Sequence, residues 1–487
     1  MRANEPFRES RFATTHTICI HGQEITFDAI AEDFVFTDEQ GEPEASLFTY
    51  TYLRKGTAGE GRPVLFAWDG GPGGSCLPEQ LYFFGPWRLP DGAFGAPYAL
   101  EDNPHCLLDA CDIVLVDPVG TGFGRLLNGE KAAKYYGTIG DTEAMADFIE
   151  AWLTHYHRWN SPLYLCGTSY GSIRCARVVE ELNGGAFHKN GRQRSIAVDG
   201  VILVGNTTWL PTQDIAAEDN SAASVLPAGT IPTVLLMPTF AAANWYHNAD
   251  HQGETLDACC ERAWNWAWAK LEPVLSGKRI ADETEKAALA AEMSDITGIG
   301  VETLLAMDLQ ISQSEMFAAM LLADRGLDIG IYDSRMTLCQ NDKIGVPDPA
   351  ADDPAMSVQT VPQMAAGNSL LKDKLGITFG RQLIDVNYGI NAQWDYSTPE
   401  MLVPEIPKRD HNQCLAAAMR RNERMKLLVA TGAYDMCTWS GLNRYTAENS
   451  GFPRERTEVR LYPSGHTAFA GEEAAALFER DVRNMLK

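Results

Sequence analysis

The chain has 487 residues, of which 45% are hydrophobic and 22% charged, as in an ordinary globular protein rather than a disordered or fibrous one. It carries 40 basic and 65 acidic residues, and this formal charge of −25 argues against nucleic acid and anionic membrane surfaces as partners. We therefore expect a small peptide or a small-molecule ester or amide as the substrate, and a large α/β core with an inserted second domain.

The cysteines and the N-terminus bear on location. Eleven cysteines are scattered along the chain without the paired spacing of a metal site. The first twenty residues hold no apolar run long enough for the central segment of a signal peptide, and no other segment reaches membrane-spanning length. We predict a cytoplasmic protein with reduced cysteines and with neither a metal nor a cofactor. A secreted protein whose signal peptide was removed before numbering is the alternative.

The first two hundred residues contain two kinds of predicted strand. The early ones alternate polar and apolar residues, which predicts antiparallel hairpins over 16–20, 24–29, 32–37 and 46–54. The later ones are continuous apolar runs, typical of buried parallel strands, at 63–68, 113–117, 163–166 and 198–204. Helical periodicity over 142–153 and 173–182 places helices on both sides of the third of these runs.

The composition changes between about 215 and 395. Residues 238–325 are rich in Ala, Leu, Met, Glu and Trp at helical spacing, and we interpret the Trp264, Trp266 and Trp268 group as helix packing rather than ligand stacking. Apolar strands return at 426–431 and 459–462, followed by a helix over 473–485. We predict a mostly parallel central sheet flanked by helices, in core segments 1–214 and 396–487, with a helical cap over 215–395.

The pentapeptide Gly-Thr-Ser-Tyr-Gly at 167–171 directly follows a predicted buried strand and precedes a predicted helix. A serine at the centre of G-x-S-x-G lies on a sharp strand-to-helix turn that exposes its hydroxyl, and the flanking glycines remove side chains that would collide there. The sequence therefore nominates Ser169 as a nucleophile.

A serine nucleophile needs a base, and the base needs an acid to fix its tautomer. Asp435 follows the strand at 426–431, and His466 lies in the loop before the last helix, in the order Ser, Asp, His that an α/β-hydrolase fold uses. His105 and His411 are the alternative bases. His247 and His251 have helical spacing but no Glu between them and no third ligand, so we assign them to packing rather than to a metal site.

A tetrahedral intermediate also needs amide donors for its oxyanion. Residues 68–75, Trp-Asp-Gly-Gly-Pro-Gly-Gly-Ser, follow a predicted core strand and offer a bare glycine backbone. We predict that the amides of Gly71 and Tyr170 form the oxyanion hole. A phosphate-binding loop is the alternative, but Pro72 removes a donor and the lysine of a P-loop is missing.

Four stretches together resemble the serine carboxypeptidase family of α/β-hydrolases. They are 68–75, the run Val-Asp-Pro-Val-Gly-Thr-Gly-Phe at 116–123, the pentapeptide at 167–171, and Gly432 to Asp435 with Gly465-His466. The resemblance implies an α/β-hydrolase fold with Ser169, Asp435 and His466 as its triad, in a bacterial, non-secreted member. The proline iminopeptidase group, which shares the G-G-P-G-G loop, is the runner-up.

The chain departs from the family where the family holds a substrate carboxylate. Asp69 stands in place of an Asn and Thr168 in place of a Glu, so we place substrate binding at Asp69, Gly70 and Thr168 with altered chemistry. The family's further Glu falls near Tyr82 or Phe83, which are aromatic. The carboxylate site therefore looks dismantled, and an acid pH optimum is not required of this chain.

Two further interpretations follow from this loss. Arg88 or Arg125 is a candidate replacement for binding an anion, although each is equally well explained as a structural residue. The favoured function is a serine carboxypeptidase-like hydrolase acting through an acyl-enzyme on a peptide or amide. The alternatives are an esterase or acyltransferase of the same family, a proline iminopeptidase-like aminopeptidase, and a non-catalytic binding protein on the same scaffold.

Overall fold

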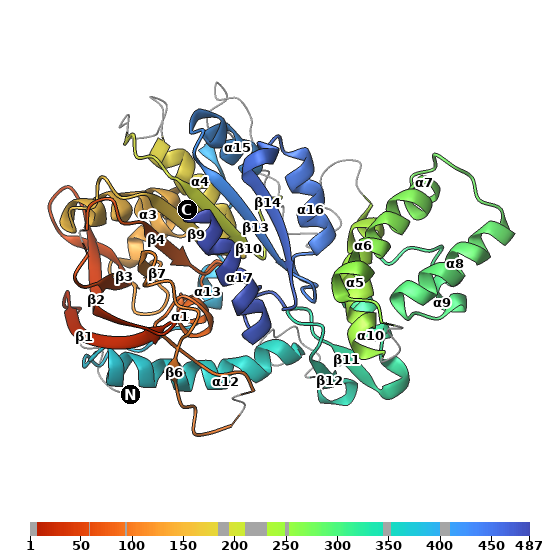
Figure 1. The fold of residues 1–487 in the computed structure, drawn as a ribbon, viewed down its shortest axis with the longest axis horizontal. Coiled ribbons are helices and arrows are strands. Elements are labelled where there is room, and N and C mark those ends of the chain that lie inside the picture. The colour runs from red at the N-terminus through yellow and green to blue at the C-terminus, as the bar shows by residue number, and fades with distance from the viewer. Residues whose placement is uncertain are drawn as a thin grey trace.

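A ten-stranded sheet runs through the centre of the molecule (Figure 1). The structure, a computed structural model, describes residues 7–487 except 58, 93–94, 184–193, 210–230, 249–252, 344–351 and 400–409. The strand order is β1-β2-β3-β7-β4-β9-β10-β13-β14, with β8 paired to β3. These strands are β1 (Arg11–Ile20), β2 (Gln23–Thr37), β3 (Pro43–Arg54), β4 (Val64–Trp68), β7 (Asp112–Asp117), β8 (Arg125–Leu126), β9 (Leu163–Thr168), β10 (Gly200–Val204), β13 (Lys426–Gly432) and β14 (Thr457–Tyr462).

The sheet has an antiparallel part and a parallel part, as the sequence predicts. β1, β2, β3 and β7 pair antiparallel, whereas β7, β4, β9, β10, β13 and β14 run parallel. The sequence analysis divided 24–37 into two strands, but β2 is continuous, because Ile30 and Ala31 are buried in the ladder and no turn residue interrupts it.

Helices cover both faces of the sheet. The helices of the described chain are α1 (Leu77–Tyr82), α2 (Ala132–Tyr135), α3 (Thr138–His155), α4 (Tyr170–Asn183), α5 (Pro232–His247), α6 (Leu256–Trp266), α7 (Glu272–Leu275), α8 (Glu283–Thr297), α9 (Val301–Ala306), α10 (Ser314–Met320), α12 (Pro354–Ser369), α13 (Tyr388–Asn391), α15 (His411–Arg421), α16 (Ser440–Asn449) and α17 (Glu472–Met485). Two short ribbons, β5 (Trp87–Arg88) with β6 (Glu101–Asp102) and β11 (Leu327–Ile329) with β12 (Thr337–Cys339), lie outside the main sheet.

Side chains of each central strand enter two different cores. In β4, Phe66 and Trp68 face α3 and α4, whereas Leu65 and Ala67 face the core that contains residues of α1, α12 and α17. Both faces are apolar because helices cover both, which explains why these strands read as continuous apolar runs. The six parallel strands run in one direction, so the polar loops that follow them all emerge at the same edge of the sheet.

The predicted cap region divides into two parts. Helices α5 to α10 form a group beside the sheet with their own hydrophobic core, shown in green in Figure 1. Within it Trp264 is buried and Trp268 stacks on Tyr445 of α16, in agreement with the packing interpretation. By contrast, α12 contributes to the main core, with Leu370 and Leu371 following it. The domain boundaries themselves stay predictions, and position 214 lies outside the described residues.

Two global features bear on location. All eleven cysteines lie in the described part of the chain, and all are free thiols. No helix among the described residues is both long enough and apolar enough to cross a membrane.

Candidate active site

Ser169 occupies a strained turn between β9 and α4. Its φ is +56°, in the left-handed region that costs free energy for a residue with a Cβ. The turn closes only with glycines beside it, since a Cβ on Gly167 would lie 2.0 Å from the carbonyl oxygen of Gly171. The Ser169 amide donates to Val204 O at 2.8 Å, and the Ser172 hydroxyl donates to Ser169 O at 2.6 Å. These contacts hold the backbone in the conformation expected of a nucleophile turn.

His466 and Asp435 lie together on the loops after β14 and β13. His466 Nδ1 lies 2.9 Å from Asp435 Oδ2, and the His466 amide donates to Tyr332 O at 2.7 Å. Asp435 is fully buried and accepts the amides of Cys437 and Thr438 at 2.8 and 2.9 Å, together with the Thr438 hydroxyl. A buried carboxylate with this many donors is well placed to orient an imidazole.

The electrostatics of His466 suit a proton acceptor. Burial lowers the pKa of its imidazole, but the Asp435 carboxylate and its hydrogen bond raise it more, and Asp69 adds to the increase, so the pKa lies above 6.5. A charge that develops on the imidazole during catalysis is therefore stabilised by Asp69 and Asp353 as well as by Asp435.

A cavity of about 470 Å³ opens beside the serine. Ser169, His466, Asp69, Gly71 and Thr168 all line it, so one space brings together residues from three separate segments. Asp435 lies behind the histidine.

The glycine loop after β4 lies directly against the serine turn. A Cβ on Gly70 would be 2.4 Å from the amide nitrogen of Tyr170, so only glycine allows this approach. Gly71 has a φ of +100° and lines the cavity. The amides of Gly71 and Tyr170 therefore lie on two backbone segments that contact each other next to Ser169.

The sequence analysis missed one acid behind the cavity. Glu79 of α1 is fully buried, and its Oε1 accepts the Thr168 hydroxyl at 2.6 Å. Counting residues along the loop could not anticipate that the first turn of α1 faces β9. Its Oε2 has no partner among the described residues.

Asp69 and Glu79 affect each other's ionisation. Burial raises the pKa of Asp69 to about 6, against the opposing effect of the Gly70 amide. Burial and the charge of Asp69 raise the pKa of Glu79 well above its usual range. The negative charge of Asp69 therefore disfavours ionisation of Glu79.

Asp385 is a second residue that no sequence motif indicated. It lines the same cavity and accepts Ser75 Oγ at 2.9 Å and Gln363 Nε2 at 2.7 Å. It lies in the segment predicted as cap, and backbone bridges from Gly74 to Val386 tie that segment to the glycine loop.

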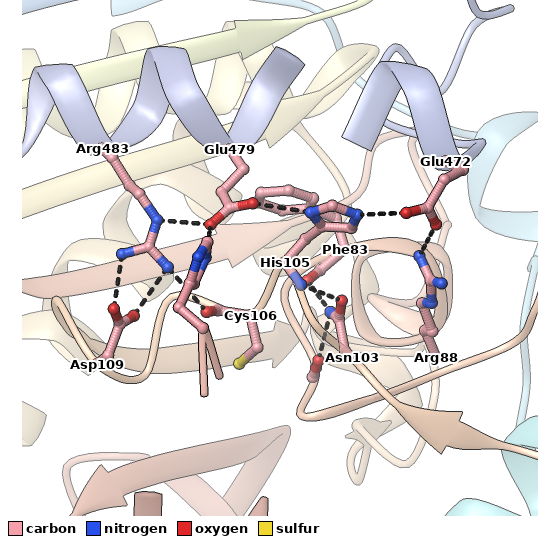
Figure 2. Close-up of polar contacts among 11 residues, drawn as sticks. Phe83, Arg88, Asn103, His105, Cys106, Asp109, Glu472, Glu479 and Arg483 are labelled. Carbon is pink, nitrogen blue, oxygen red and sulfur yellow. Dashed lines mark hydrogen bonds and ion pairs between the residues drawn. The ribbon is translucent and has the colours of Figure 1, made fainter. Parts of the chain in front are cut away.

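The two candidate arginines form ion pairs or hydrogen bonds away from the cavity. Arg88 forms an ion pair with Glu101 at 2.8 Å and another with Glu472 at 2.6 Å, which Figure 2 shows. Arg125 donates to backbone carbonyl oxygens, including Gly122 O at 3.0 Å. Neither lines the cavity, so the hypothesis that one of them binds a substrate anion there was wrong.

The alternative histidines are also engaged away from the serine. His105 contacts Glu479 and Glu472 beneath α17, as Figure 2 shows, and His411 contacts Arg177 Nε at 2.9 Å. His247 lies 2.7 Å from Ser334 O, whereas His251 lies outside the described residues. In the part of the chain that the structure describes, no group of three or more His, Cys, Asp or Glu could hold a metal ion.

Comparisons with known proteins agree with the sequence motifs. The family model described as serine carboxypeptidase matches residues 32–262. The predicted resemblance to the serine carboxypeptidases is confirmed. Serine carboxypeptidase-like 8 of Arabidopsis thaliana is 28% identical over 150 residues, 30% of this chain and 34% of that protein. Serine carboxypeptidase-like 10 of the same plant is 27% identical over 152 residues, again 30% and 34%. The chain thus matches about a third of the length of these curated relatives.

A solved structure extends the likeness to the whole fold. A prohormone-processing carboxypeptidase from Saccharomyces cerevisiae superposes with a TM-score of 0.51 and 14% identity, over 94% of this chain and 91% of that one. The α/β-hydrolase fold predicted from the sequence is therefore confirmed, with a mostly parallel sheet, flanking helices and N-terminal antiparallel strands. The family match ends at residue 262, before Asp435 and His466, whose placement comes from the structure alone.

Proposed function

We propose that this chain is a serine carboxypeptidase-like hydrolase that cleaves a peptide or amide bond through an acyl-enzyme. The observation that carries the proposal is the cavity in which Ser169, on its left-handed turn, and His466, bonded to buried Asp435, both appear. An exposed hydroxyl and an oriented imidazole in one cavity are the elements of nucleophilic acyl transfer.

The proposed reaction has two halves. In the first, His466 Nε2 takes the Ser169 hydroxyl proton as Oγ attacks the substrate carbonyl, and the amides of Gly71 and Tyr170 donate to the oxyanion. When the intermediate collapses, His466 passes that proton to the departing amine, leaving the acyl group on Oγ. In the second half, His466 deprotonates a water that attacks the ester, and the proton returns to Ser169 as the acid product leaves.

The rest of the cavity would position the substrate. Asp69, Gly70 and Thr168 lie beside Ser169, and we assign them to substrate binding. Asp435 would hold the imidazole in the tautomer that presents Nε2 to the serine, and would stabilise the imidazolium that forms.

Labelling with a fluorophosphonate tests the proposal. We expect the wild type to be modified at Ser169, as identified by peptide mass spectrometry, and Ser169→Ala to be inert. Ser276→Ala, on an exposed turn after α7, is the matched control and should label like the wild type. A folded wild-type protein that does not label, or one that labels at another serine, would support a binding protein and overturn the proposal.

Location is a separate proposal. The free state of all eleven cysteines supports a reducing compartment, for which we propose the cytoplasm. Fractionation of cells expressing the full chain checks it, since recovery in a membrane or secreted fraction would contradict it.

A further inference from the structure

Among the described residues, the cavity beside Ser169 is lined by acidic side chains but not by lysine or arginine. The acidic side chains are those of three aspartates. One of them, Asp333, is neutralised by Arg335, whose Nη2 lies 2.6 Å from its Oδ2. For Asp69 and Asp385 no such ion pair is found with any described residue.

Asp69 lines the cavity together with Ser169 and His466. It directly follows β4, its carboxyl lies against Gly74, and its charge acts on His466. The guanidinium of Arg174 donates to the backbone oxygen of Asp69 at 2.6 Å, but its Nε lies 2.7 Å from Asp141, with which it forms a buried ion pair. Arg174 is thus paired with the carboxylate of Asp141, and it does not line the cavity.

Two further carboxyl groups, those of Glu79 and Asp385, interact with Asp69. Glu79 lies behind Thr168, whose hydroxyl it accepts, and the charge of Asp69 raises the pKa of Glu79. Its other carboxyl oxygen has no partner among the described residues. Asp385 accepts hydrogen bonds from the neutral donors Ser75 and Gln363, which leave its charge uncompensated. A carboxylate entering this region would meet like charges in a poorly solvated space, whereas a cation would meet opposite ones.

We propose that Asp69 is a specificity-determining residue, and that with Asp385 it makes the cavity select a substrate bearing an ammonium or guanidinium group over one bearing a carboxylate. The inference rests on the proposed function, because it names the substrate class of the same site. The cation belongs either to the departing amine or to a free amino group on the acyl part, and the experiment separates these sources.

A matched substrate panel provides the first test. N-acetylphenylalanine is linked through an amide to glycine, ethanolamine or ethylenediamine, which present a carboxylate, a hydroxyl and an ammonium at the same position. Phenylalanine ethanolamide with a free amino group is the fourth member. At pH 7.5 we expect one of the two cationic substrates to have a kcat/KM at least about tenfold above that of the carboxylate.

Asp69→Asn supplies the decisive comparison. The amide keeps the shape and can still accept the Gly70 amide, but it removes the charge. We expect the ratio of cationic to carboxylate kcat/KM to fall at least about tenfold. Asp308→Asn, whose side chain is 70% exposed on a turn of the α5 to α10 group, is the control and should keep the wild-type ratio. A wild type that prefers the carboxylate, or an Asp69→Asn ratio equal to that of the wild type, overturns the inference.

A second measurement separates this inference from the proposed function. Benzylammonium, benzyl alcohol and phenylacetate are compared by calorimetric titration and by how far each slows fluorophosphonate labelling. We expect benzylammonium to bind most tightly in the wild type and to lose that advantage in Asp69→Asn. If Ser169 does not label, the proposed function fails while calorimetry still decides the charge preference. If Ser169 labels but phenylacetate binds as tightly as benzylammonium, only the charge inference fails.

Discussion

Replacing Glu479 with glutamine removes the charge at the centre of the network beneath α17 (Figure 2). Glu479 contacts His105 Nδ1 at 2.7 Å, His21 Nε2 at 2.5 Å and Arg483 Nε at 2.6 Å. Arg483 in turn contacts Asp109 at 2.9 Å. The network joins the C-terminal helix to the loop before β7 and to the β1–β2 turn, so its loss should destabilise the closure of the core on that side.

The magnitude follows from the ionisation of the carboxyl. Burial raises the pKa of Glu479, but the hydrogen bonds from His105, Arg483 and His21 lower it more, to about 2 instead of 4.5. At about 1.4 kcal/mol for each pKa unit, the charged form contributes about 3 kcal/mol to the free energy of unfolding near neutral pH. The side chain is only 8% exposed, so solvent screening reduces this value little.

The pH dependence has a definite sign. The hydrogen bond to Glu479 raises the pKa of His105 above 6.5, so its contribution is complete below pH 6.5 and is lost as the pH rises through the raised value. The contribution of Glu479 is present above pH 4.5 and is lost as the pH falls toward 2. Both contributions are complete between about pH 4.5 and 6.5, and the variant should lose most stability there.

Urea unfolding followed by tryptophan fluorescence at pH 5.5 and pH 9 measures this loss. Glu472→Gln is the matched control, because its side chain is 60% exposed and its pairs with Arg88 and His105 should be worth less than about 1 kcal/mol. The reasoning is refuted if Glu479→Gln costs no more than the control, or if its cost is larger at pH 9 than at pH 5.5.

Three other outcomes are expected. Gly70→Ala would place a methyl group against the Tyr170 amide, and we expect kcat/KM for an activated ester to fall about 100-fold. The melting temperature should fall as well, because the methyl group would also lie 2.5 Å from the Thr168 carbonyl oxygen. Arg174→Met would leave Asp141 buried and unpaired, at a cost of about 3–5 kcal/mol in urea unfolding, most of which Asp141→Asn should restore. The pKa of His466 is raised, so kcat/KM for an uncharged ester should increase with pH through a midpoint above 6.5, and a midpoint near 5 would contradict its role as the base.

The parallel sheet could be predicted because its signal is local. Each central strand is covered by helices on both faces, so it is apolar throughout and ends where a polar loop begins. The turn at Ser169 is equally local, since a strand, two glycines and a helix within twenty residues define it. The loops carrying Asp435 and His466 were found by the same reasoning, because each follows an apolar strand.

The acidic surroundings of the serine could not be predicted in this way. Glu79 reaches Thr168 only because α1 begins at Leu77 and turns its buried face toward β9. Asp385 approaches the glycine loop through backbone bridges formed by a segment more than three hundred residues away. Such contacts depend on how distant segments pack, and no periodicity or spacing in one segment encodes them.

This difference matters for substrate selection. The net charge of −25 describes mostly solvated side chains, which screening makes nearly irrelevant to a ligand inside a cavity. The field at Ser169 is set instead by a few poorly solvated groups, Asp69, Glu79 and Asp385, and by the fact that Arg174 is shared with Asp141. A substitution at Asp69 alone should therefore alter charge selectivity, whereas removing many surface acids should not.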